Sequence, residues 1–174
     1  METKEIDGST ETVRPSVIEA KESVCGRYCI FTKQKFSIEI PKDWEIVATN
    51  IMSDFGIQFI TAKVYGGYSP SLNLNITPIE RSMDFCQLIT EAKNGLVTMG
   101  ITDITTGNIE ISGRRWEVLS GNDSRTTVSD LKYRSYVTQM TDAHFCFTFS
   151  YQQSTLSEYE DVVDRMMRTF RPIE

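Results

Sequence analysis

The sequence predicts an α+β domain in which an antiparallel β-sheet is sandwiched by helices. Three observations predict this class. Short segments alternate between apolar and polar residues and are joined by tight turns, which makes them antiparallel strands. Two further segments carry apolar residues at helical spacing. The chain has 174 residues, of which 40% are hydrophobic, so it can bury the core of one domain.

Alternation marks the strands of the first half. In "FSIEIPKDW" (36–44) every second residue from Phe36 to Ile40 is apolar. Pro41 ends this strand because proline cannot donate to the ladder. The next strands expected are "FGIQFITAKVY" (55–65) and "LNLNITPI" (72–79).

The sequence of the second half of the chain predicts two hairpins. "NIEISGRRWEVLSG" (108–121) turns at Ser112-Gly113. "TTVSDLKYRSYVTQM" (126–140) and "HFCFTFSY" (144–151) are joined by a turn at residues 141–143. The last strand carries aromatic residues of one parity, which we expect to face a core: Phe145, Phe147, Phe149 and Tyr151.

Two helices are expected. The first is capped by Ser82 and stopped at Gly100, with Phe85, Leu88, Ile89, Ala92 and Leu96 on one face. In the second, Ser157 and Glu160 have the spacing of a capping box, and Pro172 ends the helix. Its apolar stripe comprises Tyr159, Val162, Val163, Met166, Met167 and Phe170.

The chain divides into an acidic tail (residues 1–24) and a single domain (residues 25–174). The first 22 residues hold six acids and three bases and few large apolar groups, so we expect a largely flexible tail. A short helix over residues 16–24 is the alternative within it.

Composition excludes several classes of protein. The formal net charge of −6 argues against non-specific binding to nucleic acid, which needs clustered cations. The longest apolar run is far too short to span a bilayer. No charged-then-apolar leader follows Met1, which predicts a cytoplasmic protein, or a periplasmic or surface-exported one if a leader has been removed.

The four cysteines are Cys25, Cys29, Cys86 and Cys146. Cys25 and Cys29 lack the two-residue spacing of redox motifs, and no second pair completes a zinc site. We expect free thiols in a reducing compartment, with a Cys25–Cys29 disulfide as the alternative in an exported protein.

Reactive groups are few. The chain has one histidine, His144, at the start of an aromatic strand, where a solvent-edge position is expected. The acids from Glu158 to Asp164 favour the N-terminal end of a helix dipole rather than acid–base chemistry. We therefore expect no catalytic residues, no cofactor and no metal.

A contact surface is the remaining kind of site. Tyr65 and Tyr68 lie in the loop "YGGYSP", where tyrosine offers contact area at low entropic cost. Basic residues gather in the second half, either as a solvated mixed-charge surface or as a patch for an acidic partner, the chain's own acidic tail included. The candidate contact residues are Tyr65, Tyr68, Arg114, Arg115, Trp116, Arg134 and Tyr136.

Three segments together carry a resemblance: the entry strand "FSIEIPKDW", the glycine hairpin leading into "GRRWEV", and the closing helix "YEDVVDRMMRTFRPI". With the central helix they resemble the PsbP-like superfamily over about Tyr28 to Pro172. That superfamily includes extrinsic photosystem II proteins, a Ran-release factor and DcrB-like bacterial proteins. The loop sequences of the first and the acidic motif of the second have no match here, so the DcrB-like branch is favoured.

The resemblance implies an α/β/α sandwich and a non-catalytic binding module. Its bacterial version is an adaptor or chaperone that binds a segment of a partner protein, a secreted effector being one such partner. A chaperone of this kind would be a homodimer. The alternative is a small-ligand carrier or enzyme with a pocket between sheet and helix, to which Tyr65, Tyr68, Trp116, Tyr133, Tyr136 or Cys86 would contribute.

Overall fold

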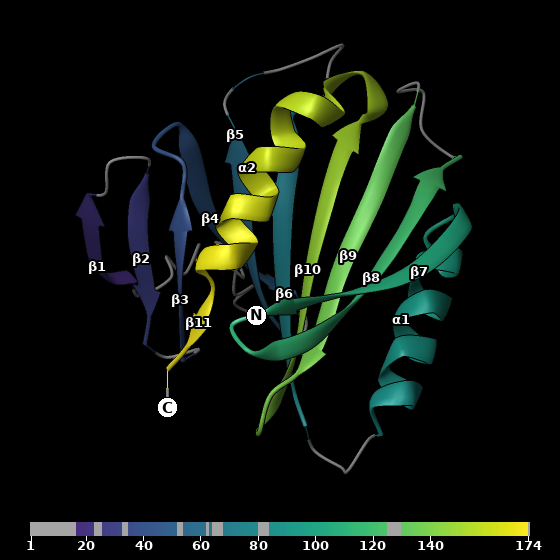
Figure 1. Cartoon of the computed structure of the whole chain (residues 1–174), viewed down its shortest axis with the longest axis horizontal. Helices are drawn as coiled ribbons and strands as arrows, with labels where there is room; N and C mark the ends of the chain where they lie inside the picture. Colours follow the sequence, from purple (N-terminus) through teal and green to yellow (C-terminus); the bar gives the residue numbers. More distant parts are fainter. Residues whose placement is uncertain are drawn as a thin grey trace, which may run out of the picture.

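The structure is a computed structural model that describes residues 17–22, 26–32, 35–51, 54–61, 63, 68–79, 84–124 and 130–173. Two antiparallel sheets and two long helices make up this part of the chain (Figure 1). None of the described helices is long and apolar enough to cross a bilayer. The acidic segment before residue 17 lies outside the described residues, as do Tyr65 and Cys25.

The large sheet has seven strands in the order β4-β5-β6-β10-β9-β8-β7. Every neighbouring pair is antiparallel, as predicted for strands joined by short turns, and the β6–β10 pair, which is distant in the chain, is antiparallel as well. The strands are β4 (Trp44–Ile51), β5 (Asp54–Thr61), β6 (Ser71–Pro78), β7 (Ile101–Ile111), β8 (Arg114–Asp123), β9 (Leu131–Gln139) and β10 (Ala143–Gln152).

The small sheet corrects one prediction. Its order is β1-β2-β3-β11, with β1 (Val17–Glu22), β2 (Arg27–Phe31), β3 (Phe36–Ile40) and β11 (Arg171–Pro172). The short helix suggested for residues 16–24 is wrong, because Val17–Glu22 is a strand paired with β2. Pairing with a neighbouring strand outweighs the weak helical preference of so short a segment.

Helix α1 (Phe85–Thr98) begins two residues later than predicted. Asp84, not Ser82, is its N-cap: the Asp84 side chain accepts from the Cys86 backbone, and Gln87 reaches back to complete a capping box. Ser82 lies outside the described residues. Gly100 has φ of +80° just past the helix, as the C-terminal signal predicted.

Helix α2 (Leu156–Thr169) follows a short 3₁₀ turn, η1 (Gln153–Thr155). Its predicted apolar stripe is buried apart from Val162, which is half-buried. Arg171 closes its C-terminal end, because Nη1 donates to the carbonyl oxygens of Arg168 and Phe170 at 2.7 Å each. A guanidinium there satisfies carbonyls that lack partners within the helix. The side chain of Ser157 is not described.

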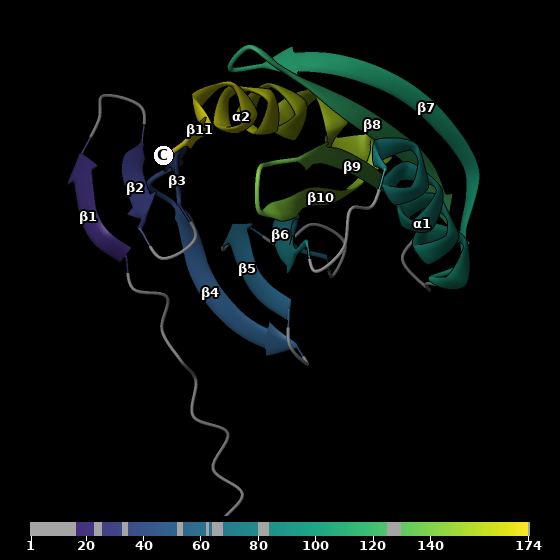
Figure 2. The same cartoon turned by 90° about the horizontal axis from the view of Figure 1, so that it is seen from below.

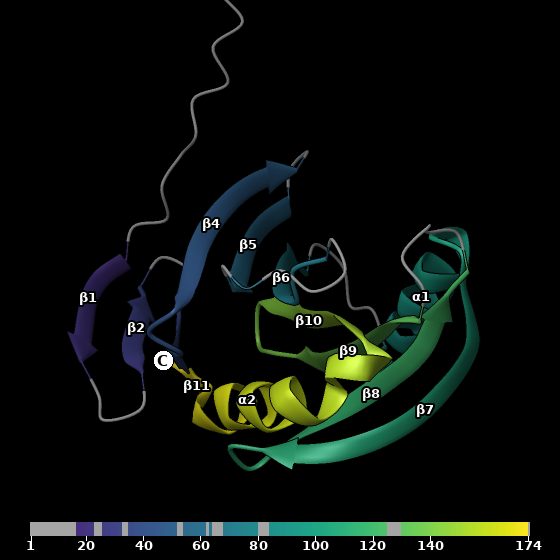
Figure 3. The ribbon, with the colours of Figure 1, turned by 90° about the horizontal axis from the view of Figure 1, so that it is seen from above.

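The helices cover opposite faces of the large sheet, so the predicted sandwich is confirmed (Figures 2 and 3). One face packs against α2 and the small sheet and contains Trp116, Tyr136 and the predicted aromatic stripe of β10. The other packs against α1 through Leu88, Leu119 and Val137. Neighbouring residues such as Tyr136 and Val137 therefore belong to different cores, as strand pleating requires.

Phe170 is the centre of the α2-side core. Its ring lies 5.3 to 5.9 Å from the rings of Phe36, Trp116, Phe145 and Phe147. Three of these contacts are edge-on, a favoured geometry for aromatic pairs. Because Phe170 follows the last turn of α2, this packing fixes where the helix ends on the sheet.

Candidate binding groove

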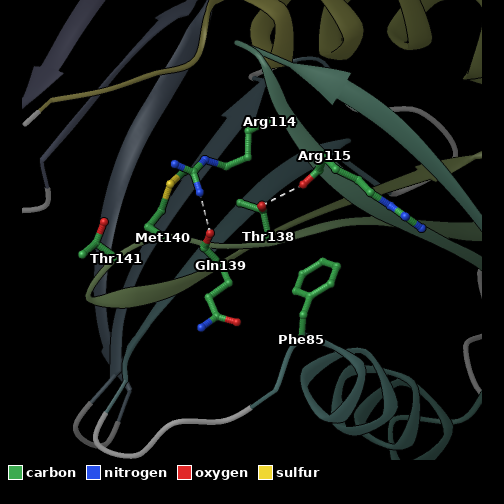
Figure 4. Close-up of a pocket in the computed structure, with 7 residues that line it drawn as sticks. All are labelled: Phe85, Arg114, Arg115, Thr138, Gln139, Met140 and Thr141. Carbon is green, nitrogen blue, oxygen red and sulfur yellow. Dashed lines mark hydrogen bonds between the residues drawn. The ribbon is translucent and has the colours of Figure 1, made fainter.

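A pocket of about 450 Å³ opens at the end of the large sheet (Figure 4). The start of β8, the end of β9 and the first residue of α1 form its walls. A second hollow of about 320 Å³ lies beside it and shares Arg114, Met140 and Thr141. We call the two together the Arg114 groove. Its lining residues are Lys35, Phe85, Arg114, Arg115, Thr138, Gln139, Met140, Thr141, Asp142, Phe145, Pro172 and Ile173.

Two turns build this end of the sheet. Ser112 and Gly113 have φ of +55° and +70°, the conformation of a tight hairpin turn between β7 and β8. Arg114 follows as the first residue of β8. The turn after β9 is closed by the Met140 amide, which donates to the Ala143 carbonyl at 2.8 Å. Both turns were predicted from the sequence.

Arg114 has an exposed side chain with unused donors. Nη1 donates to the Gln139 backbone carbonyl at 2.9 Å (Figure 4). Within the described part of the chain, no carboxylate lies within ion-pair distance of this guanidinium. Because a guanidinium has five N–H donors, Arg114 is held in place and can still bind an anion.

The other two cations of the groove already have acidic partners. Arg115 pairs with Glu117, whose side chain is only 10% exposed. Lys35 pairs with Asp142 at 3.3 Å, and both of these side chains are more than half exposed. Exposed pairs of this kind contribute about 0–1 kcal/mol, so a bound anion can replace Asp142 at small cost.

Apolar side chains lie next to these charges. Phe85 is half-buried at the start of α1, and Met140 stands between the two hollows. Thr138 Oγ1 donates to the Arg115 carbonyl at 2.9 Å and so ties β9 to β8 beneath the pocket. The groove therefore combines an adaptable apolar floor with cationic walls.

Of the seven predicted contact residues, Arg114 and Arg115 line the groove. Trp116 and Tyr136 are 0% and 2% exposed, so their assignment to a contact surface is wrong. Their parity on the strands turns them into the α2-side core. Tyr65 lies outside the described residues.

Tyr68 and Arg134 lie far from the groove. The Tyr68 hydroxyl donates to Ser150, which is seven residues along β10 from Ala143, about 23 Å at strand spacing. Burial raises the pKa of Tyr68. Arg134 Nη1 binds Glu160 of α2 at 2.8 Å, so this guanidinium already has a carboxylate partner.

Arg134 instead fastens α2 to the sheet. Burial alone lowers the pKa of Arg134, but hydrogen bonds with Tyr136 and Glu160 outweigh it and the pKa is raised. The Tyr136 hydroxyl donates to Asp164 of α2 at 3.4 Å. Burial raises the pKa of Tyr136 to about 12. These groups form a polar cross-link between β9 and the helix.

The reactive side chains His144, Cys86 and Cys146 are not among the residues that line the groove. Burial lowers the pKa of His144 and raises that of Cys146, which shares its face of β10. His144 Nε2 is buried and has no hydrogen-bond partner among the described residues. Cys86 is exposed on α1. Within the described ranges, no three His, Cys, Asp or Glu side chains lie close enough to hold a metal ion.

Sequence reasoning missed most of the groove. Lys35, Phe85 and Met140 come from three distant segments, and no local pattern links them. One signal was available in the sequence. If the strand after the Ser112-Gly113 turn pairs with the strand before the turn at residues 141–143, "GRR" lies beside that second turn. Continuing the β8–β9 register from Glu117↔Val137 places Arg115 opposite Gln139.

No family model matches the chain, and no curated protein matches its sequence. Sixteen chains of solved structures match its fold, and three of them illustrate the likeness. Cyanobacterial PsbP (CyanoP) from Synechocystis has a TM-score of 0.62 at 13% identity, over 95% of this chain and 98% of that one. A Pseudomonas aeruginosa protein of unknown function, PA94, described as a candidate regulator, has a TM-score of 0.58 at 16% identity, over 79% and 92%.

A third structure, from Bacteroides thetaiotaomicron, has a TM-score of 0.51 at 15% identity. It covers 80% of this chain, which in turn spans 46% of that longer protein. At such identities the likeness concerns the fold alone. The two-helix sandwich around an antiparallel sheet agrees with the expectation from the entry strand, the glycine hairpin and the closing helix. The chain has a PsbP-like fold.

Proposed function

We propose that this protein is a non-catalytic interaction module that binds an extended segment of a partner protein in the Arg114 groove. The observation that carries the proposal is the state of Arg114. Its guanidinium is exposed, oriented by Gln139, and without a carboxylate partner among the described residues. An oriented cation beside apolar side chains fits a ligand that places a carboxylate next to an apolar group.

The groove suggests how such a segment would lie. An apolar side chain of the partner packs against Phe85 and Met140, and its carboxylate receives N–H donors from Arg114. A second carboxylate, further along the segment, meets Lys35 in the adjoining hollow and displaces Asp142. Two subsites joined across Met140 favour an extended segment over a compact ligand.

We further place the chain with the DcrB-like bacterial branch, as an adaptor or chaperone whose partner is a protein segment such as part of a secreted effector. This placement rests on the sequence resemblance described above. The fold is compatible with it. A chaperone of this kind is expected to be a homodimer, which sedimentation of the purified chain tests directly.

Peptide display provides the test. Random 12-residue peptides on phage are selected against the wild-type protein, and enriched peptides are resynthesised for fluorescence polarisation. We expect enriched sequences that pair Asp or Glu with apolar residues. Arg114→Gln should weaken their binding about tenfold or more, since one charge-assisted pair contributes about 1.5–3 kcal/mol.

Lys42→Gln is the matched control. It also removes one exposed cation. Lys35 directly precedes β3, whereas Lys42 lies in the turn that follows β3, at the other end of the strand. This variant should bind the peptides like wild type apart from a small loss at low salt. Enrichment of peptides without acidic residues, or equal binding to the Arg114 and Lys42 variants, contradicts the proposed site.

A second candidate is a small anionic ligand. The larger pocket, at about 450 Å³, has the size of small-molecule sites and lies between the sheet and α1, where the alternative function placed it. Native mass spectrometry of the purified protein detects a retained ligand. A bound small acid that is lost in Arg114→Gln, together with no enriched peptide, would favour this candidate over the first.

A further inference from the structure

One row of paired residues crosses the small sheet at one end. It runs from Val17, the first described residue, to the wall of the Arg114 groove. Val17 lies opposite Phe31, Phe31 opposite Phe36, and Phe36 opposite Pro172. Pro172 lines the second hollow of the Arg114 groove. Three strand spacings separate the two ends of the row, about 14 Å in all.

Residues 1–16 are attached at the near end of this row. A segment of 16 residues extends to at most about 53 Å, and a flexible chain of this length has a root-mean-square span of roughly 22 Å. Both lengths exceed the distance from Val17 to the wall of the groove. The segment can therefore reach the groove without any change in the described fold.

The segment and the groove have complementary charges. Residues 1–16 carry the four acids Glu2, Glu5, Asp7 and Glu11 against the two bases Lys4 and Arg14. Ile6 lies between two of the acids, the pairing of apolar and acidic groups that the groove fits. The groove offers Arg114, which has no carboxylate partner among the described residues, and Lys35, whose partner is exposed.

We propose that residues 1–16 bind in the Arg114 groove of the same molecule and compete there with the partner segment. This inference rests on the proposed function of the groove. A tether of this length gives an effective concentration on the order of millimolar, so even a weak contact is populated. The acidic segment then acts as a built-in competitor that sets a threshold for partner binding.

The test uses the full chain with its acids neutralised. One variant carries Glu2→Gln, Glu5→Gln, Asp7→Asn and Glu11→Gln together. Its nuclear magnetic resonance spectrum is compared with wild type at the backbone amides of Gln139–Asp142 and the side-chain Nε–H of Arg114. We expect shifts at these groups, none near Lys42, and their disappearance at high salt.

A synthetic peptide of residues 1–16 is then added to the neutralised variant. It should move the same resonances toward their wild-type positions, whereas the peptide with its four acids as amides should not. Adding Arg114→Gln to the protein should abolish the response. Identical groove resonances in wild type and the neutralised variant would overturn the inference.

The two proposals fail in different ways. A selected partner peptide should bind the neutralised variant about three- to tenfold more tightly than wild type, because the competitor is gone. If partner peptides bind both proteins equally, the competition is wrong and the groove's function stands. If the groove resonances respond to residues 1–16 but no partner peptide is found, the proposed function fails and the intramolecular contact stands.

Discussion

Arg114 and Arg134 lie on neighbouring strands and on the same face of the large sheet, yet their surroundings differ. Ser120 lies opposite Arg134 in the β8–β9 register, and Arg114 has the parity of Ser120. Arg134 is half-buried and binds Glu160, whereas Arg114 is exposed and binds a backbone carbonyl. The same residue type therefore fastens a helix at one place and remains available to a ligand at the other.

The difference comes from where α2 ends. The helix runs along this face from Glu160, beside Arg134, to Phe170, which packs against Trp116. Beyond Phe170 the chain continues into the small sheet. The Ser112 hydroxyl donates to the Phe170 carbonyl, and Arg171 Nη1 donates to Ser112 Oγ at 2.7 Å. Arg114 lies past this end of the helix. Two predictions test this boundary, and two more concern charged or titratable groups on the opposite face of the sheet.

Trp116→Ala should have the largest effect, a loss of about 3–5 kcal/mol in the free energy of unfolding. Trp116 is fully buried against Phe147 and Phe170 on the covered side of the boundary. Trp116→Phe should cost far less, because Trp116 Nε1 has no hydrogen-bond partner in the described structure. Urea denaturation measures both. Equal losses would mean that a phenyl ring recovers none of the packing, so that the full indole ring or its N–H is required here.

Arg134→Ala should destabilise the fold by about 1–3 kcal/mol, since it removes the cross-link between β9 and α2 and leaves Glu160 unpaired. Arg114→Ala is its matched control and should stay within about 0.5 kcal/mol of wild type. Thermal or urea unfolding of both variants checks the contrast. If the two variants lose the same stability, the division between a structural and a free arginine is wrong.

Arg115→Ala should lower the free energy of unfolding by about 1 kcal/mol. This loss lies between those expected for Arg134→Ala and Arg114→Ala. Arg115 is exposed, but its partner Glu117 is nearly buried and would lose its counter-charge. The double variant with Glu117→Gln should recover most of the loss, which a double-mutant cycle quantifies. Purely additive losses would show that the pair contributes nothing to folding.

His144 should make stability fall as the pH is lowered. Burial lowers its pKa below the ordinary 6.5, and Glu91 on α1 opposes this shift; Gln139 and Thr77 are its neighbours across the sheet. The unfolded chain therefore binds the proton first, so stability is retained above pH 6.5 and lost between 6.5 and the lowered pKa. The slope stays below about 1.4 kcal/mol per pH unit.

His144→Gln isolates this contribution from that of the carboxylates. The wild type should lose more stability than the variant between pH 7.5 and 5, measured as the difference in urea midpoints multiplied by the slope. A variant that follows the wild-type curve would indicate that His144 is already hydrated in the folded protein.

Local periodicity was sufficient for the elements whose apolar residues repeat. The alternation of β6 and the aromatic stripe of β10 predicted their inward faces, and the stripe of α2 was placed residue by residue. Strands without a strong repeat were missed or shortened. In β7 the isoleucines are unevenly spaced among threonine and other polar residues, and Val17–Glu22 is half charged, so neither carries a clear pattern.

The candidate site was predicted less well for a different reason. In the structure, Arg114, Trp116, Arg134 and Tyr136 have the parity of one face of the large sheet. Parity does not say what covers that face. Trp116 and Tyr136 were predicted from the sequence to be contact residues, but α2 buries them. Met140 and Phe85 come from distant segments of the chain, and only the folded structure brings them together in the site.

The sequence by itself determined the sandwich, its turns and the inward stripes of β6, β10 and the two helices, because these depend on residues a few positions apart. Only the tertiary structure decided which cations remain free. That choice depends on where α2 stops over the sheet, which is fixed by the packing of Phe170 among four rings from three separate strands. Contacts between distant segments are set by the balance of burial over the whole core, which no local pattern encodes.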